Sequence, residues 1–254
     1  ESQATALVKK CLSFIQGDVT DFEFSDQSVL RDIMPLNRQQ TYDIRKVAKT
    51  LVDADSFLEL TSGFGKSILT AFARIEGKAV GLIASNCESL GGALDANGAI
   101  KASRFFNICN VFKVPIVSLV DTPGFMVGPE SEKQGAVNHM TGLFVAGAKL
   151  EVPLVCIFLR KGYGLGAMAM SGGSFKIPRY TASWPMGEFG AMGIEGAVKL
   201  GFKKELESVE DGLTRDNLFA DLVDKMYDRG KATEAASFLE IDAVIDPSES
   251  RFLI

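Results

Sequence analysis

The spacing of hydrophobic residues along the chain changes from helix-like to strand-like near residue 55. Apolar positions recur at helical spacing over 4–16 and again over 42–53, so each stretch predicts a helix. The polar, mixed segment 18–41 between them predicts a linker. Three β-like runs follow, the last two joined by a predicted hairpin turn at Glu76–Lys78: Phe57–Leu60, Ile68–Ile75 and Val80–Ser85.

From residue 95 onward, helical patterns alternate with short apolar runs. Helices are predicted over 96–112, about 132–150, from a start within 164–172, and over about 194–200, 203–210 and 213–230. Strands are predicted at Pro115–Val120, Pro153–Leu159, near Tyr180–Trp184 and at Ile241–Ile245. Alternating strands and helices indicate a mostly parallel sheet buried on both faces. The sequence therefore predicts one α/β domain over 42–254, preceded by an N-terminal helix and linker over 1–41.

Composition excludes several classes of partner. The net charge of −5, with no basic run, argues against nucleic-acid binding. No apolar run reaches the ~18 residues of a membrane span. The four cysteines are scattered without metal-ligand spacing, which favours buried, reduced thiols and no metal site. Because the chain begins at Glu1 inside a helical pattern, we expect it to be a piece of a longer protein.

Two familiar catalytic patterns are incomplete in this sequence. Gly65-Lys66-Ser67 looks like the end of a phosphate-binding loop, but Leu60 stands where that loop needs its first glycine, and a β-like run follows. His139 is the only histidine, and no Gly-x-Ser-x-Gly elbow presents a nucleophile. Any chemistry should therefore depend on backbone amides.

Two glycine-rich turns fit that requirement, Gly91–Ala93 and Lys161–Ala167. Each follows an apolar strand and precedes a helix. Small residues let the backbone approach a ligand, and the start of a helix leaves amide N–H groups unpaired. Two such groups aimed at one point make an oxyanion hole, which stabilises an enolate. The alternative is that both segments are ordinary turns.

The residues of 90–125 resemble a known family. The segments Gly92–Asp95, Lys101–Phe105, Val114–Pro115 and Asp121–Phe125 are similar to the carboxyltransferase β-subunits of propionyl-CoA and related acyl-CoA carboxylases. The likeness continues through Arg160–Gly164, Trp184-Pro185, Glu195–Val198 and Ile241–Ile245. It runs collinearly from about Tyr42 to the C-terminus and corresponds to the C-terminal half of such a subunit.

The resemblance implies the crotonase (ClpP-like) fold, an α/β superhelix of ββα units. It also implies transfer of a carboxyl group between carboxybiotin, held on a carrier domain, and the α-carbon of an acyl-CoA. In the family, carboxybiotin is thought to release CO2, the biotin enolate takes the α-proton, and the acyl enolate attacks CO2. Two oxyanion holes, one in each half, hold the two enolates.

Carried onto this sequence, the biotin-side donors are the backbone amides of Leu165 and Gly166. The remaining expected pocket residues are Gly162, Tyr163, Gly164, Ala167, Met168, Gly91, Gly92, Ala93, Pro123, Gly124 and Phe125. Leu165 departs from the family's usual glycine, so its side chain must point away from biotin. Met168 stands where the family carries an acyl-discriminating Asp, which indicates an acyl preference other than propionyl or acetyl.

The resemblance also implies partners: an N-terminal carboxyltransferase half, a biotin carboxylase and a biotin carrier domain. We expect the chain to form homo-oligomers, to be inactive alone, and to work in the cytoplasm or, in a eukaryote, the mitochondrial matrix. Two alternatives share its motifs. One is the α-subunit of a sodium-pump-type acyl-CoA decarboxylase, and the other is a non-catalytic crotonase-fold assembly module.

Overall fold

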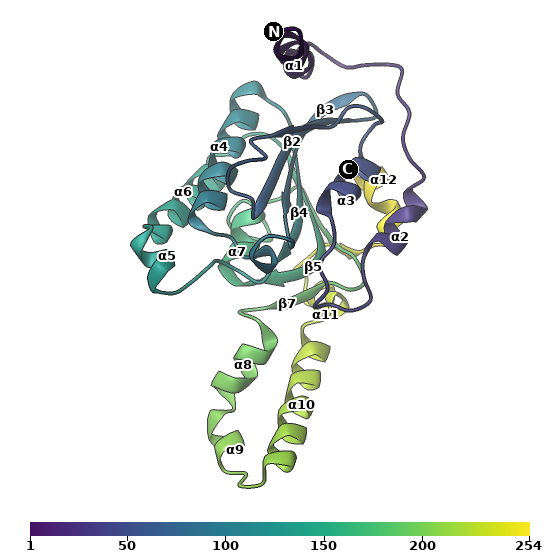
Figure 1. The fold of residues 1–254 in the computed structure, drawn as a ribbon. Helices are drawn as coiled ribbons and strands as arrows, with labels where there is room; N and C mark the ends of the chain where they lie inside the picture. Colours follow the sequence, from purple (N-terminus) through teal and green to yellow (C-terminus); the bar gives the residue numbers. More distant parts are fainter.

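The computed structural model describes residues 1–254, which form a mixed sheet flanked by helices (Figure 1). The strand order is β1-β2-β3-β4-β5-β6-β8. The short strand β7 pairs with the last three residues of β5, past the stretch of β5 that pairs with β6. Pairing is antiparallel from β1 to β3 and parallel from there on. The strands are β1 (Leu58–Leu60), β2 (Ile68–Ile75), β3 (Lys78–Ser85), β4 (Ile116–Thr122), β5 (Leu154–Tyr163), β6 (Tyr180–Ser183), β7 (Glu188–Gly190) and β8 (Ala243–Val244).

The β2–β3 hairpin confirms the turn predicted from the sequence. Ile75 pairs with Lys78, so Glu76 and Gly77 alone make the turn, with φ of 52° and 75°. A two-residue turn with two positive φ angles matches the right-handed twist of the strands it joins. A side chain at Gly77 would also collide with the Val19 carbonyl.

Helices bury apolar side chains on both faces of the sheet, as the continuous apolar strands predict. On one face, Phe106 and Leu143 belong to a core cluster that also takes in α7 and α11. On the other face, Leu30, Ile44 and Trp184 belong to a second cluster, against which the last helix packs. The first face carries α4 (Ala96–Phe112), α6 (Ala136–Ala148), α7 (Gly164–Met170) and α11 (Ala232–Ser237); the second carries α2 (Leu30–Ile33), α3 (Ile44–Leu51) and α12 (Ser250–Leu253).

Three sequence-based expectations need correction. The predicted linker 18–41 contains α2, whose Leu30 is fully buried, because a four-residue helix is too short to show a period. The predicted helix 132–150 is two helices, α5 (Pro129–Lys133) and α6, separated at Gly135, whose φ is 67°. The strand predicted at Pro153–Leu159 extends to Tyr163, because its last three residues pair with β7.

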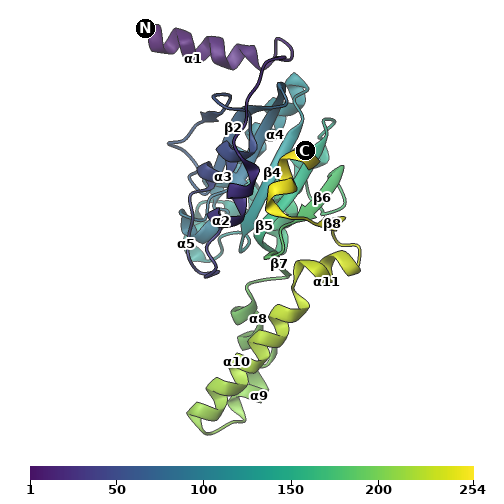
Figure 2. The same ribbon diagram turned by 90° about the vertical axis from the view of Figure 1, so that its right-hand side faces the viewer.

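Two helical segments extend from the body of the molecule (Figures 1 and 2). The helices α8 (Ile194–Gly201), α9 (Lys203–Glu207) and α10 (Gly212–Arg229) form a projecting hairpin. A small cluster of Tyr163, Ile194, Val198 and Val223 anchors it to the sheet. At the opposite end, α1 (Ser2–Ser13) has no buried residue. None of the helices combines the length and apolar character needed to cross a membrane.

Candidate functional site

The structure brings the two predicted glycine-rich segments, Gly91–Ala93 and Lys161–Ala167, together with the Pro123–Phe125 turn beside the carboxyl ends of β4 and β5. The Leu94 amide donates to the Gly124 carbonyl at 3.0 Å, and the Met126 amide donates to the Leu94 carbonyl at 2.7 Å. These bonds join the Gly91–Ala93 turn to the Pro123–Phe125 turn. Gly166 lies against the second turn, because a Cβ there would be 2.7 Å from the Gly124 carbonyl carbon.

At two of these positions, Gly92 and Gly166, the neighbouring backbone leaves no room for a side chain. A Cβ on Gly92 would lie 2.5 Å from the Asp121 carbonyl oxygen, and Gly92 has a φ of 88°. A Cβ on Gly166 would press on Gly124 and on the Phe125 amide nitrogen, 3.0 Å away. The small residues of these turns therefore serve close packing of one backbone on another. Gly91 differs, since it is exposed and nothing lies within 4 Å of its ideal Cβ.

The segment Lys161–Ala167 is divided between a strand and a helix rather than forming one turn. Gly162 and Tyr163 continue β5, paired with Phe189 and Gly190 of β7. The chain then changes direction at Gly164, whose φ is 57°. A Cβ on Gly162 would touch the Phe158 ring at 2.8 Å, so this glycine also permits tight packing.

Two backbone amides at the start of α7 have no hydrogen-bond acceptor in the chain. Leu165 and Gly166 precede the point at which a helix can supply i−4 acceptors, and neither N–H has an acceptor within the chain. The Leu165 side chain is 61% exposed, whereas Gly166 and Ala167 are buried. The bulky residue at 165 is thus accommodated by turning its side chain to the surface. Met168, on the next part of α7, is half-buried.

The Tyr163 side chain serves a different purpose from the pocket role expected for it. Its hydroxyl donates to Glu188 Oε2 at 2.7 Å, and its ring packs in the cluster that anchors the α8–α10 hairpin. Burial raises the pKa of Tyr163, and the neighbouring Glu188 carboxylate adds to this effect. Tyr163 therefore contributes backbone to the glycine segments, while its side chain joins the sheet to the hairpin.

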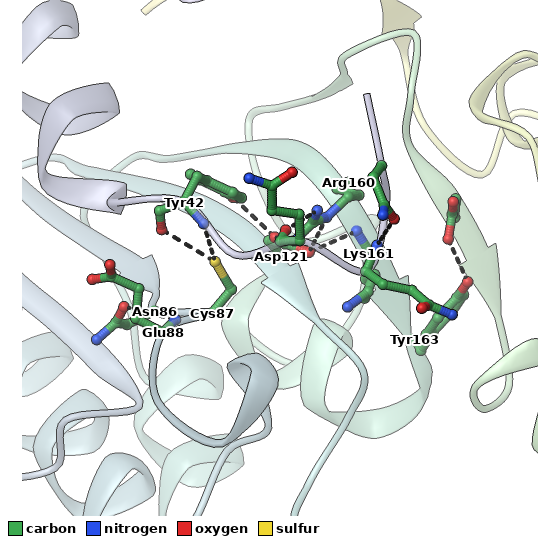
Figure 3. A network of polar contacts seen from close by, with 12 residues as sticks. Tyr42, Asn86, Cys87, Glu88, Asp121, Arg160, Lys161 and Tyr163 are labelled. Carbon is green, nitrogen blue, oxygen red and sulfur yellow. Dashed lines mark hydrogen bonds and ion pairs between the residues drawn. The ribbon is translucent and has the colours of Figure 1, made fainter. Parts of the chain in front are cut away.

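A buried ion pair between Asp121 and Arg160 adjoins the start of the Lys161–Ala167 segment (Figure 3). Arg160 Nη2 donates to Asp121 Oδ2 at 2.9 Å, and the two side chains are 2% and 1% exposed. Asp121 also accepts the Lys161 amide at 3.0 Å and the Tyr42 hydroxyl at 2.9 Å. The second guanidinium nitrogen of Arg160 donates to the Gln40 carbonyl at 2.9 Å. One carboxylate therefore joins β4, the end of β5 and the segment before α3.

Burial and the charge of Asp121 both raise the pKa values of the titratable groups around this ion pair. Burial raises the pKa of Tyr42 well above its usual value, and the Asp121 carboxylate adds to the increase. Tyr42 therefore remains a hydrogen-bond donor across the working pH range. Burial likewise raises the pKa of the Cys87 thiol, which lies 3.3 Å from the Tyr42 amide nitrogen and carbonyl oxygen. The other cysteines are also unpaired in the structure.

Sequence reasoning missed the role of Asp121, Arg160 and Tyr42. Asp121 and Arg160 had been noted only as parts of family motifs. A signal was nevertheless present, because each charged residue directly follows an apolar run, Ile116–Val120 and Leu154–Leu159. Charged residues at the ends of adjacent buried strands must find partners, and the nearest partner is the opposite charge on the next strand.

The fold is a mixed α/β sheet flanked by helices, and three glycine-containing segments meet near the carboxyl ends of β4 and β5. The sequence matches the carboxyl transferase domain over residues 1–253, and the chain belongs to that family. It is 34% identical over 261 residues to the methylmalonyl-CoA carboxyltransferase 12S subunit of Propionibacterium freudenreichii subsp. shermanii, covering 99% of this chain and 49% of that protein. The family resemblance found in the sequence is thereby confirmed, and the match also includes residues 1–41, which the sequence-based extent from about Tyr42 had left out.

Solved structures confirm the crotonase fold. A single-chain, multi-domain long-chain acyl-CoA carboxylase matches with a TM-score of 0.91 and 48% identity, over 98% of this chain and 24% of that one. The transcarboxylase 12S structure, described as a hexamer assembly, matches with a TM-score of 0.87 and 32% identity, over 98% of this chain and 49% of that one. The chain spans about half the length of the curated relatives it matches.

Proposed function

We propose that this chain supplies the biotin-side half of the active site of an acyl-CoA carboxyltransferase. Membership of the carboxyl transferase family supports the reaction class. The observation that carries the assignment of the site is the pair of unpartnered amides at Leu165 and Gly166, packed against the Gly124 turn. The other half of the site would come from the carboxyltransferase N-terminal half, and in support this chain matches only about half the length of its relatives.

The residues present fit the ureido group of biotin. Its carbonyl oxygen can accept two N–H donors, and the chain offers two adjacent ones at the start of α7. Biotin, brought by a carrier domain, would supply the transferable carboxyl group. The chain's part is to stabilise negative charge on the ureido oxygen with donors that need no reorganisation. Asp121 holds the Lys161 amide, four residues before Leu165, and so fixes the end of β5 from which α7 starts.

We further propose a longer acyl-CoA as the substrate. The chain shares 48% identity with a long-chain acyl-CoA carboxylase, against 34% with the methylmalonyl-CoA carboxyltransferase subunit. The apolar Met168, followed by Ala169 and Met170, suits an aliphatic chain better than a carboxylate would. In this proposal a biotin carboxylase loads the carrier, and copies of the chain associate within an oligomer that works in the cytoplasm or mitochondrial matrix.

An assay of the complete carboxyltransferase tests this function. Given biotin carboxylase, a biotinylated carrier, ATP and bicarbonate, the enzyme should carboxylate acyl-CoAs, with kcat/KM rising from acetyl- to palmitoyl-CoA. Met168→Asp should lower kcat/KM for the longest substrates more than for propionyl-CoA, while the exposed Lys176→Gln should leave the profile unchanged. Absence of transfer to every acyl-CoA, in both the carboxylating and decarboxylating directions, would sink the proposal. The 254-residue chain alone should show no turnover.

A further inference from the structure

The Lys101–Phe105 motif lies on α4, and the proposed carboxyl transfer makes no use of it. Lys101 is only 4% exposed, and its ammonium donates to the Ile68 carbonyl at 2.8 Å. It has no ion-pair partner in the structure. Burial lowers the pKa of Lys101, and the nearby Glu59 carboxylate offsets only part of this effect.

A second cation lies beside it without a partner. Arg104 is three residues further along α4 and therefore lies on the same side of the helix as Lys101. Arg104 is exposed, and its side chain makes neither a hydrogen bond nor an ion pair. The nearby acid Glu59 is already engaged, because Arg45 binds both of its carboxylate oxygens at 2.8 and 2.7 Å.

The two cations line a cavity of about 90 Å³ between α4 and the edge of the sheet at β1 and β2. Half of its lining is apolar: Leu60, Phe64, Phe105 and Ile108. The remaining lining residues, Thr61 and Thr70, are uncharged, so no acidic residue borders the cavity. A buried cation facing an acid-free cavity is stabilised when an anion enters.

We propose that this cavity binds a small carboxylate that carries a short aliphatic tail. A carboxylate head would pair with Lys101 and with the planar guanidinium of Arg104, whose geometry matches carboxylate oxygens. The aliphatic tail would replace water against Phe64, Phe105 and Ile108. A singly charged carboxylate suits this half-apolar lining better than phosphate, whose larger charge is more costly to desolvate.

This site is separate from the glycine segments. Its α4 residues, Lys101 to Ile108, begin about 8 Å along the helix axis from Ala96, where the helix starts beside the Gly91–Ala93 turn, and end about 18 Å from it. A ligand here would contact α4, β1 and β2 and leave the Leu165 and Gly166 amides free. The proposal therefore stands independently of carboxyl transfer, and a binding experiment tests it without any measurement of turnover.

NMR titration of the isotopically labelled 254-residue protein provides the test. Sodium acetate, propionate and butyrate should each cause saturable amide shifts in α4 and β1–β2, at ionic strength held constant with sodium chloride. Affinity should rise about fourfold for each added methylene, because each one is buried against the apolar wall. Sodium phosphate should bind more weakly than butyrate.

Two variants test whether butyrate binds at the cavity beside α4. Arg104→Gln keeps an exposed polar side chain and should weaken butyrate binding about tenfold or more. Arg179→Gln, also at an exposed arginine without a side-chain contact, should change nothing. The proposal is overturned by an absence of saturable butyrate shifts, by equal affinity for acetate and butyrate, by phosphate binding as tightly as butyrate, or by an Arg104→Gln variant that binds butyrate normally.

Discussion

Replacement of Asp121 with alanine should lower the free energy of unfolding of this chain by ~3–5 kcal/mol. The substitution leaves the Arg160 guanidinium charged and 98% buried without its counter-ion. It also removes the acceptor for the Tyr42 hydroxyl and the Lys161 amide. Since the free energy of unfolding of a domain is only about 5–15 kcal/mol, this one carboxylate contributes a large part of the stability.

Urea unfolding followed by circular dichroism measures this loss. The double variant Asp121→Ala with Arg160→Met removes both charges and should recover much of the lost stability, because no unpaired charge remains. Glu151→Ala breaks the exposed pair with Lys113 and should leave the urea midpoint unchanged. If Asp121→Ala unfolds at the wild-type urea concentration, or if the double variant is less stable than the single one, the ion pair does not have this role.

Leu165→Pro should lower turnover of the complete carboxyltransferase by about 10²–10³-fold, the usual cost of one lost oxyanion donor. Proline has no N–H, so one of the two amides disappears. The change falls in the first turn of α7, where proline is tolerated and no intrahelical hydrogen bond is lost. The Leu165 side chain is 61% exposed, so its removal should cost little packing.

Leu165→Ala is the matched control, because it shortens the side chain and keeps the amide. It should retain turnover within about twofold of the wild type. Both variants should unfold at temperatures close to that of the wild type, which would separate a lost donor from a lost fold. A Leu165→Pro enzyme with near-normal kcat, or equal losses in the two variants, would refute the assignment of the amide.

Local signals predicted the central part of the fold. Helix α4 was predicted over 96–112 from the alternation of helical patterns and apolar runs, and these are its bounds in the structure, where Asp95 caps its first turn through the Gly98 amide. The hairpin was predicted because a short polar segment containing glycine separates two β-like runs. Gly77 suits its positive φ, whereas a positive φ is uncommon for a residue such as Glu76. The strand β7 was missed, because Glu188–Gly190 shows no apolar alternation and is extended only through pairing with β5.

In the candidate site, too, features set by local sequence were predicted and features set by long-range pairing were not. The glycines were visible in the sequence, but their meeting was not predicted. In the structure they meet because they follow β3, β4 and β5, which are consecutive in the sheet. The partition of Lys161–Ala167 into strand and helix was not visible, because it depends on pairing with β7. The buried partners of Asp121 also lie far along the chain, at Tyr42 and Arg160, so only the folded structure joins them. The Leu165 side chain is exposed, and its direction away from biotin stays a prediction.

The most direct measurement is a crystal structure of the complete carboxyltransferase with biotin bound. Our account predicts the ureido carbonyl oxygen at 2.7–3.1 Å from the backbone nitrogens of both Leu165 and Gly166, the range for an oxyanion-hole donor. It also predicts that the Leu165 side chain points away from the ureido ring. A biotin whose ureido oxygen contacts other groups, with both amides facing solvent or the protein, would contradict the central claim.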